Sequence, residues 1–270
     1  TGSIGDSTLR VVKKDMKSFR IKLLTTNNNI KKIYKQALKF NVKDIVIFNK
    51  EKYQKNHKVI LCVPDTLIYY ISNRIKSKLI SIGGQNCHKN NKFGPFTGSV
   101  SAGMLKNAGA KYIILGHSEN RLEGETDKEI KKKIESAFKE KLNIIFCIGE
   151  TAKEKKNGKT FVTLKRQLIN SIPKKNLMDK IIVAYEPRWS IGTGKIPAAS
   201  ELTNIFIFIK KELKKISKSK KTNKILYGGS VNAHNINMFS SMPDLDGFLI
   251  GGASQSSKKF IDIIKNYYKE

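Results

Sequence analysis

Cysteine is scarce in this sequence, and its placement excludes two classes of stabilisation. The 270 residues include only three cysteines, Cys62, Cys87 and Cys147, with no C-x-x-C pair and no histidine–cysteine cluster at metal-ligand spacing. Such scattered thiols argue against a disulfide framework and a structural metal, and they favour a reducing compartment. Cys62 and Cys147 fall in apolar runs, where a small buried hydrophobic residue is the ordinary interpretation.

Long apolar runs are also missing. None approaches the roughly 18–20 residues that cross a bilayer, and the chain opens with no signal-peptide pattern. Thr1 to Lys17 are polar and without period, so we treat residues 1–17 as an extension, either the remnant of a tag or of a trimmed targeting segment. The hydrophobic content of 39% supports a sizeable core in residues 18–270, although length alone permits one large domain or two ordinary ones.

Acidic residues are few beside basic ones, which leaves a formal net charge of +30. Of the 52 basic residues only six are arginine, leaving 46 lysines spread over nearly every polar stretch. Nucleic-acid-binding proteins usually cluster their basic residues, often with arginine and exposed aromatic side chains. A solvated lysine surface is therefore favoured over a DNA or RNA partner, and its field draws in small anions.

Short, β-branched apolar runs alternate with amphipathic stretches along the chain. The predicted strands are Arg20–Thr25, Lys58–Val63, Leu79–Gly83, Lys111–Leu115, Asn143–Ile148, Lys180–Tyr185, Lys224–Tyr227 and Gly247–Ile250. The predicted helices are Ile30–Phe40, Asp65–Ser77, Ser101–Ala108, Thr126–Lys141, Thr160–Ile172, Ala198–Ile216, His234–Ser241 and Ser256–Tyr268. Asn41–His57 is the least regular part and is expected to be a long connection.

Continuous apolar strands indicate burial on both faces, as in a parallel sheet covered by helices. Eight strands and eight helices in strict alternation predict a single (β/α)8 barrel of eight parallel strands ringed by eight helices, and the usual length of about 250 residues fits. A doubly wound open sheet is the alternative. It would favour a G-x-G-x-x-G turn after the first strand, and the sequence has none there.

Chemistry in such a barrel lies in the loops after the strands, at their carboxyl ends. His117 follows the fourth predicted strand and Glu186 follows the sixth. Either residue alone is often structural, the carboxylate as a cap or ion-pair partner and the imidazole as a hydrogen-bonded bystander. Together on one barrel face, a carboxylate and an imidazole can serve as base and electrophile for moving a proton beside a carbonyl.

Two glycine turns follow the last two strands. Gly228-Gly229-Ser230 and Gly251-Gly252 allow close backbone approach and present N–H groups to an anion. Barrels often bind phosphate with these two loops. The sequence therefore predicts a phosphate site there.

The segment after Glu186 has the composition of a lid. Ile191-Gly192-Thr193-Gly194 can swing over the site, and the Gly192 N–H can reach the phosphate on closure. Closure excludes water and protects a reactive intermediate. A static surface turn is the alternative.

Five segments give the chain a resemblance to the triosephosphate isomerase family: "AGAKYIILGHSENR", "IIFCIGE", "IVAYEPRWSIGTGK", "ILYGGSV" and "DLDGFLIGGAS". They occur in family order with similar spacing over Val59 to Glu270. The resemblance implies cofactor-independent interconversion of dihydroxyacetone phosphate and glyceraldehyde 3-phosphate, with no metal. It also implies a homodimer and a role in glycolysis and gluconeogenesis.

The same resemblance implies residue roles. Glu186 would be the base, His117 the neutral electrophile, and Glu119 a supporting carboxylate. The phosphate would lie against Gly192, Ser230, Gly251 and Gly252. The lid and its latch would comprise Pro187, Trp189, Ile191, Thr193, Gly194, Lys195, Ser230 and Tyr227.

The N-terminal region departs from the family pattern "NWKMN". The nearest match is "FRIKLL", which keeps Lys22 as a candidate active-site lysine but places Arg20 where the family has asparagine. Two interface positions also differ, because Ser99 and Asn120 replace a glutamate and an arginine that pair across the family's dimer. With Thr97 in the interface loop facing the altered Arg20 position, we expect a reworked homodimer contact.

Three functions remain open from the sequence: an active isomerase, a weakened or inactive paralogue that binds phosphorylated ligands, and nucleic-acid binding through lysines. Cytoplasmic localisation is expected, with a plastid-type organelle as the alternative.

The hinges of the predicted lid also depart from the family pattern. The family has an aliphatic residue at the position of Arg188 and a small flexible hinge at the position of the Ile196-Pro197 pair. These departures predict a lid with altered opening kinetics.

Overall fold

The structure is a computed structural model of the chain. It describes residues 58–91, 94–173, 178–216 and 223–267, two strands at 23–26 and 44–47, and the single residues Leu9, Lys13, Gln36 and Lys39, which are helical. Lys22 and Arg20 lie outside the described residues, as does nearly all of the predicted helix Ile30–Phe40.

Seven parallel strands form the main sheet, in the order in which they occur along the chain. They are β3 (Val59–Cys62), β4 (Ile80–Gly84), β5 (Tyr112–Leu115), β6 (Asn143–Ile148), β7 (Ile181–Tyr185), β8 (Ile225–Tyr227) and β9 (Gly247–Phe248). Each overlaps a predicted strand, because most of them are short, continuous apolar runs with β-branched residues.

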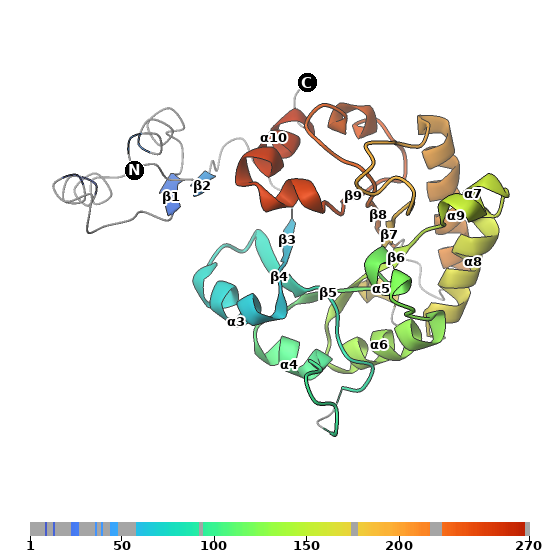
Figure 1. Ribbon diagram of the computed structural model, residues 1–270, viewed down its shortest axis with the longest axis horizontal. Coiled ribbons are helices and arrows are strands. Elements are labelled where there is room, and N and C mark those ends of the chain that lie inside the picture. The colour runs from blue at the N-terminus through green and yellow to red at the C-terminus, as the bar shows by residue number, and fades with distance from the viewer. Residues whose placement is uncertain are drawn as a thin grey trace.

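The sheet curls, with its helices on the outer side (Figure 1). They are α3 (Asp65–Arg74), α4 (Ala102–Asn107), α5 (Ser118–Leu122), α6 (Asp127–Lys139), α7 (Ala152–Lys156), α8 (Thr160–Ser171), α9 (Ala199–Ile216) and α10 (Ser257–Tyr267). Short 3-10 helices occur at η1 (Met178–Lys180), η2 (Ile236–Phe239) and η3 (Gly252–Gln255). The short α5, α7 and η3 were not predicted.

Burial on both faces of the sheet is confirmed. One apolar cluster lies between strands and helices, and alternate strand residues such as Ile113 and Leu115 belong to it. A second, smaller cluster includes Ile114, Ile145 and Cys147 and fills the inner side of the curl. Cys147 is fully buried, so its interpretation as a core residue is confirmed, whereas Cys62 is only half-buried.

The N-terminal strands depart from the predicted arrangement. β1 (Leu23–Thr26) overlaps the first predicted strand, but it pairs in parallel with β2 (Asp44–Ile47) in a separate two-stranded sheet. β2 lies close to α10, and Figure 1 shows the pair outside the ring of helices, on the side of α10. In the described part of the chain the main sheet therefore has seven strands, with β3 and β9 at its edges, and the eighth strand stays a prediction.

Two local predictions were wrong. Asn41–His57 is not only a connection, because it contains β2, whose apolar residues stand between polar, lysine-rich stretches. His234–Ser241 contains the 3-10 helix η2 rather than an α-helix. There Asn232 Oδ1 accepts from the backbone N–H groups of His234 and Asn235, and such side-chain bonds compete with α-helical ones.

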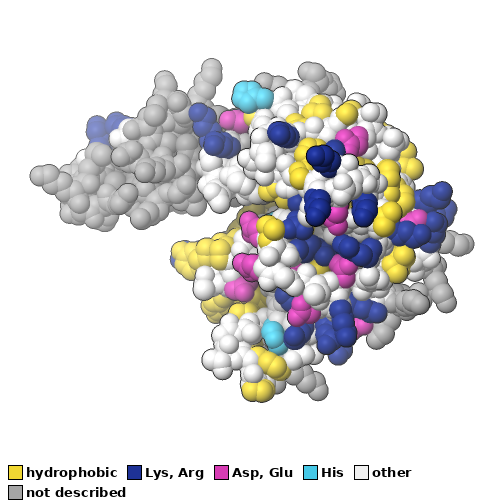
Figure 2. Space-filling model, turned by 45° about the vertical axis from the view of Figure 1, so that its right-hand side comes forward, with side chains coloured by type: hydrophobic (Ala, Val, Ile, Leu, Met, Phe, Trp, Pro, Cys, Tyr) yellow, Lys and Arg dark blue, Asp and Glu magenta, His cyan; other side chains and the backbone are white. Residues whose placement is uncertain are grey.

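Within the described residues, no helix is long and apolar enough to cross a membrane. On the face shown in Figure 2, lysine and arginine side chains are interspersed with acidic and hydrophobic ones.

Candidate active site at the carboxyl ends of the strands

Glu186 and His117 are brought together by the fold. Glu186 directly follows β7 and His117 comes two residues after β5, with β6 between the two strands. His117 Nε2 lies 3.2 Å from Glu186 Oε1. Two side chains from strands that are not neighbours meet in this way because the sheet curls toward its inner side.

The Glu186 carboxylate is almost fully enclosed, with 4% of its side chain exposed. Its Oε2 accepts the backbone N–H of Ser118 at 3.2 Å, and the Glu186 backbone N–H donates to Ile148 O at 2.7 Å. A Cβ on Gly228 would lie 2.7 Å from Glu186 Cγ. Glycine is therefore required at the end of β8 to leave room for this carboxylate.

His117 is held by the helix that it precedes. It is the N-cap of α5, and its Nδ1 accepts the backbone N–H of Glu119 at 3.4 Å. An accepting Nδ1 carries no proton, so this hydrogen-bond pattern assigns the proton of the neutral ring to Nε2, where it is donated to Glu186. The hydrogen bond to Glu186 raises the pKa of His117 above its ordinary value of 6.5, and burial opposes this shift.

Glu119 is near the imidazole but mostly in solvent. Its Oε2 lies 3.6 Å from His117 Nδ1, and its side chain is 83% exposed. The structure thus places Glu119 beside His117 without enclosing it.

Arg121 fixes the loop that carries His117, and sequence reasoning did not identify it. Its guanidinium donates to Gly116 O at 2.8 Å and to Cys147 O at 3.3 Å, and it pairs with Asp127 at 2.7 Å. Gly116 has φ +72°, a conformation that favours glycine. The sequence signal for this role is the spacing in G-H-S-E-N-R. It places an arginine five residues after a glycine, where its guanidinium can reach back to the glycine carbonyl and close the turn.

The segment after Glu186 is fixed to the loop after β6. The Arg188 N–H donates to Glu150 O, and Trp189 Nε1 donates to Glu150 Oε1 at 2.8 Å. Tyr185 donates its hydroxyl to the same carboxylate, and Glu150 is fully buried. Glu150 anchors the start of the predicted lid, a role that the sequence "CIGE" did not reveal.

Ser190 joins both ends of the lid to the loop after β8. Its fully buried hydroxyl donates to Lys195 O at 2.5 Å and lies 3.3 Å from Tyr227 Oη. The Ser230 N–H points at Ser190 Oγ at 3.4 Å, and Ser230 Oγ accepts the Gly194 N–H at 3.1 Å. The predicted latch residues Tyr227 and Ser230 thus contact the lid, but Tyr227 does so through Ser190, which was not predicted.

Other predicted lid positions differ in exposure. Pro187 is buried, Trp189 and Ile191 are half-buried, and Gly192, Thr193, Gly194 and Lys195 are exposed. The Thr193 hydroxyl donates back to Trp189 O and Ser190 O, each at 3.1 Å. The predicted lid segment therefore has an anchored base and an exposed tip.

The two predicted phosphate turns lie side by side, because β8 and β9 are paired in parallel. Gly251 and Gly252 are exposed, and a Cβ on either would meet nothing within 4 Å. This turn opens on space that a ligand can fill. Among the described residues, no group of histidine, cysteine and acidic side chains is arranged to hold a metal ion.

Comparisons with known proteins show which family the chain belongs to. The family model described as triosephosphate isomerase matches residues 25–267. A triosephosphate isomerase of Bartonella bacilliformis is 39% identical over 214 residues, covering 78% of this chain and 84% of that protein. One of Alkaliphilus oremlandii is 36% identical over 250 residues, covering 90% of this chain and 98% of that protein.

A solved structure is similar as well. The crystal structure of triosephosphate isomerase from Bartonella henselae has a TM-score of 0.73 and 31% sequence identity, covering 93% of this chain and all of that one. The match spans most of the chain in sequence and in fold. This chain belongs to the triosephosphate isomerase family.

Proposed function

We propose that the chain interconverts dihydroxyacetone phosphate and D-glyceraldehyde 3-phosphate by proton transfer through an enediolate. The observation that carries this proposal is the 3.2 Å approach of His117 to Glu186 at the mouth of the curled sheet, within a family member. The reaction moves a proton between adjacent carbons with no net redox change, so the proposed chemistry needs no cofactor.

Glu186 is the proposed base. Its two oxygens are occupied by the Ser118 N–H and by His117. Each carboxylate oxygen keeps a second lone pair, but the side chain is only 4% exposed, so substrate reaches it by shifting the groups that enclose it. Its enclosed position keeps water away from the carbanion-like intermediate once the lid is closed.

His117 is the proposed electrophile, polarising the carbonyl from the protonated Nε2. The Glu119 N–H at Nδ1 favours the neutral ring. The raised pKa belongs to the state in which Glu186 touches the ring. When Glu186 turns to the substrate, this cause of the shift is removed and the neutral imidazole is favoured again. Glu119 is proposed as a minor support because it is largely exposed.

The phosphate is proposed to bind the N–H groups of Gly192, Ser230, Gly251 and Gly252. The Ser230 N–H now points at Ser190 Oγ, so phosphate binding would take over this donor. The lid, Pro187 to Lys195, then covers the ligand with Tyr227 and Ser230 as its latch. Lys22 is proposed as a further catalytic cation.

The finer architecture is also part of the proposal. We infer that residues 18–270 form one domain, in which the first strand completes an eight-stranded barrel, and that residues 1–17 lie outside it. A homodimer through the exposed loop around Thr97 is proposed, with Ser99 and Asn120 as its altered contacts and Arg20 as a third altered position. Cytoplasmic localisation is proposed on the family's metabolic role, with the plastid-type organelle as the alternative.

The test is a steady-state assay in both directions. The isomerase proposal predicts turnover that Lys22→Ala strongly reduces. A folded preparation without turnover would favour the phosphate-binding paralogue instead.

The nucleic-acid alternative predicts tight, steeply salt-dependent polyanion binding, and weak retention at physiological salt would exclude it. Light-scattering mass measurement of the protein tests the dimer.

A further inference from the structure

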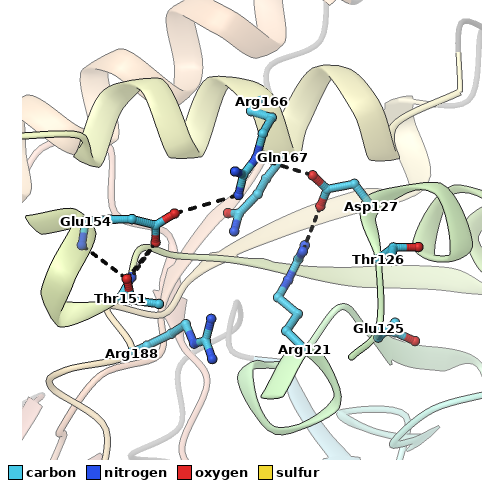
Figure 3. A pocket seen from close by; sticks show the side chains of 9 residues that line it. All are labelled: Arg121, Glu125, Thr126, Asp127, Thr151, Glu154, Arg166, Gln167 and Arg188. Atoms are coloured by element: carbon cyan, nitrogen blue, oxygen red, sulfur yellow. Dashed lines mark hydrogen bonds and ion pairs between the residues drawn. The ribbon is translucent and has the colours of Figure 1, made fainter. Parts of the chain in front are cut away.

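A second polar pocket lies beside the first residues of the lid, outside the Glu186–His117 pair. Its volume is about 220 Å³, and arginines from three parts of the chain line it: Arg121, Arg166 and Arg188 (Figure 3). These are three of only six arginines in a chain with 46 lysines. Within the described part of the chain, no lysine lines this pocket.

The acidic groups of the pocket already have partners. Asp127 pairs with Arg121 at 2.7 Å and lies 3.6 Å from Arg166. Glu154 Oε2 accepts the backbone N–H and hydroxyl of Thr151 at 2.8 and 2.9 Å, and its Oε1 lies 3.8 Å from Arg166. A third carboxylate, Glu125, is paired with Lys133.

Arg188 differs from the other two arginines. Its backbone N–H is fixed to Glu150 O at 3.1 Å, but among the described residues its guanidinium has no ion pair or hydrogen bond. Figure 3 shows this side chain between Thr151 and Arg121, with no interaction drawn to it. A guanidinium offers five N–H donors in a fork that matches phosphate and carboxylate oxygens.

We propose that this pocket binds a phosphate group, as inorganic phosphate or as a small phosphate monoester, with Arg188 as its principal contact and Arg166 as the second. The pocket is smaller than the roughly 300 Å³ at which sites for drug-sized ligands begin, which suits a small anion. The net charge of +30 raises the local concentration of such anions.

Occupancy of the pocket acts on the lid. Arg188 comes two residues after Glu186 and next to Trp189, whereas Arg166 belongs to the twelve-residue helix α8. A phosphate that bridges the two arginines ties the base of the lid to this helix and slows its movement. This regulatory consequence rests on the proposed function, but binding of phosphate to the pocket does not.

The test measures phosphate binding to the full chain by titration calorimetry. Wild type is expected to show two sites per chain, the active site and the pocket. Arg188→Gln and Arg166→Gln should each weaken the pocket site roughly tenfold or more, because each removes a charge-assisted contact. Lys153→Gln removes the same charge from an exposed position of α7 and should leave both sites unchanged. Glycerol 3-phosphate in a parallel titration distinguishes a phosphate monoester from free phosphate.

Kinetics separate the two sites in the same proteins. Active-site phosphate raises KM alone, whereas pocket phosphate lowers kcat, and Arg188→Gln should abolish only the effect on kcat. Phosphate binding in wild type that Arg188→Gln and Arg166→Gln leave unchanged, or equal weakening by Lys153→Gln, would overturn the proposal. A preparation that binds two phosphates without turnover would instead refute the isomerase function and keep the pocket.

Discussion

Nε2 of His117 lies 3.2 Å from Oε1 of Glu186, and this contact joins the ends of two strands that are not neighbours in the sheet. The pair supplies the proposed base and the proposed electrophile. It also connects the carboxyl ends of β5 and β7. A link of this kind affects stability as well as activity, which makes it testable without substrate.

The first prediction concerns the pH dependence of this link. Because the His117 pKa is raised in the folded chain, its stabilising contribution is fully present below the ordinary value of 6.5 and is lost as the pH rises through the folded-state pKa. The free energy of unfolding should therefore differ most between wild type and His117→Gln below pH 6.5. Urea denaturation across this range measures the difference, and a difference that grows with pH would contradict the assignment.

A second prediction concerns Ser190 as the bridge between lid and latch. Ser190→Ala keeps the packing of a fully buried side chain but removes the acceptor for the Ser230 N–H and the partner of Tyr227 Oη. We expect a loss of about 1–3 kcal/mol in unfolding free energy, together with a lower kcat. Ser200→Ala, at an exposed position of α9, is the matched control.

A double-mutant cycle isolates this bond. If the hydroxyls of Ser190 and Tyr227 stabilise the lid through each other, Ser190→Ala with Tyr227→Phe costs less than the sum of the single changes, by about 0.5 kcal/mol or more. Strict additivity would show that the two hydroxyls act independently.

The third prediction concerns a buried ion pair beside Asn120. Glu125 and Lys133 have side chains that are 7% and 15% exposed, and Glu125 Oε2 has no further partner among the described residues. Lys133→Met should cost about 3–5 kcal/mol in unfolding free energy because it strands a buried charge. Adding Glu125→Gln should recover part of that cost.

The matched control is Lys132→Met, which changes an exposed neighbour on the same helix. It should shift stability by no more than about 0.5 kcal/mol. Equal costs for the two lysines in thermal or urea unfolding would contradict the ion-pair account.

Much of the sheet was predictable because its strands are buried on both faces. The runs that become β5, β6 and β7 are continuous and β-branched, and their ends place His117 and Glu186 on one face. Parallel topology then brings both side chains to the same mouth. The two proposed catalytic residues could be predicted because they directly follow strands with a clear apolar pattern.

The remaining features depend on contacts between distant segments. Nothing in the lid sequence shows that Ser190 is fully buried, and it reaches Tyr227 only once β8 is in place. The Glu150 carboxylate likewise acquires its role from Tyr185 and Trp189. β2 is as long as β3 and β5, but its apolar residues stand between polar, lysine-rich stretches, and this composition favoured a connection.

The most direct measurement is the turnover of Glu186→Asp beside wild type and Glu123→Gln. The shorter side chain withdraws the carboxylate by about one methylene, and misplacement on the order of 1 Å can cost about a hundredfold in rate. Glu123 is exposed and outside the site, so its variant should retain wild-type kcat. The account predicts a loss of about a hundredfold or more in kcat for Glu186→Asp in a protein that remains folded. Wild-type turnover in a folded Glu186→Asp protein would contradict it.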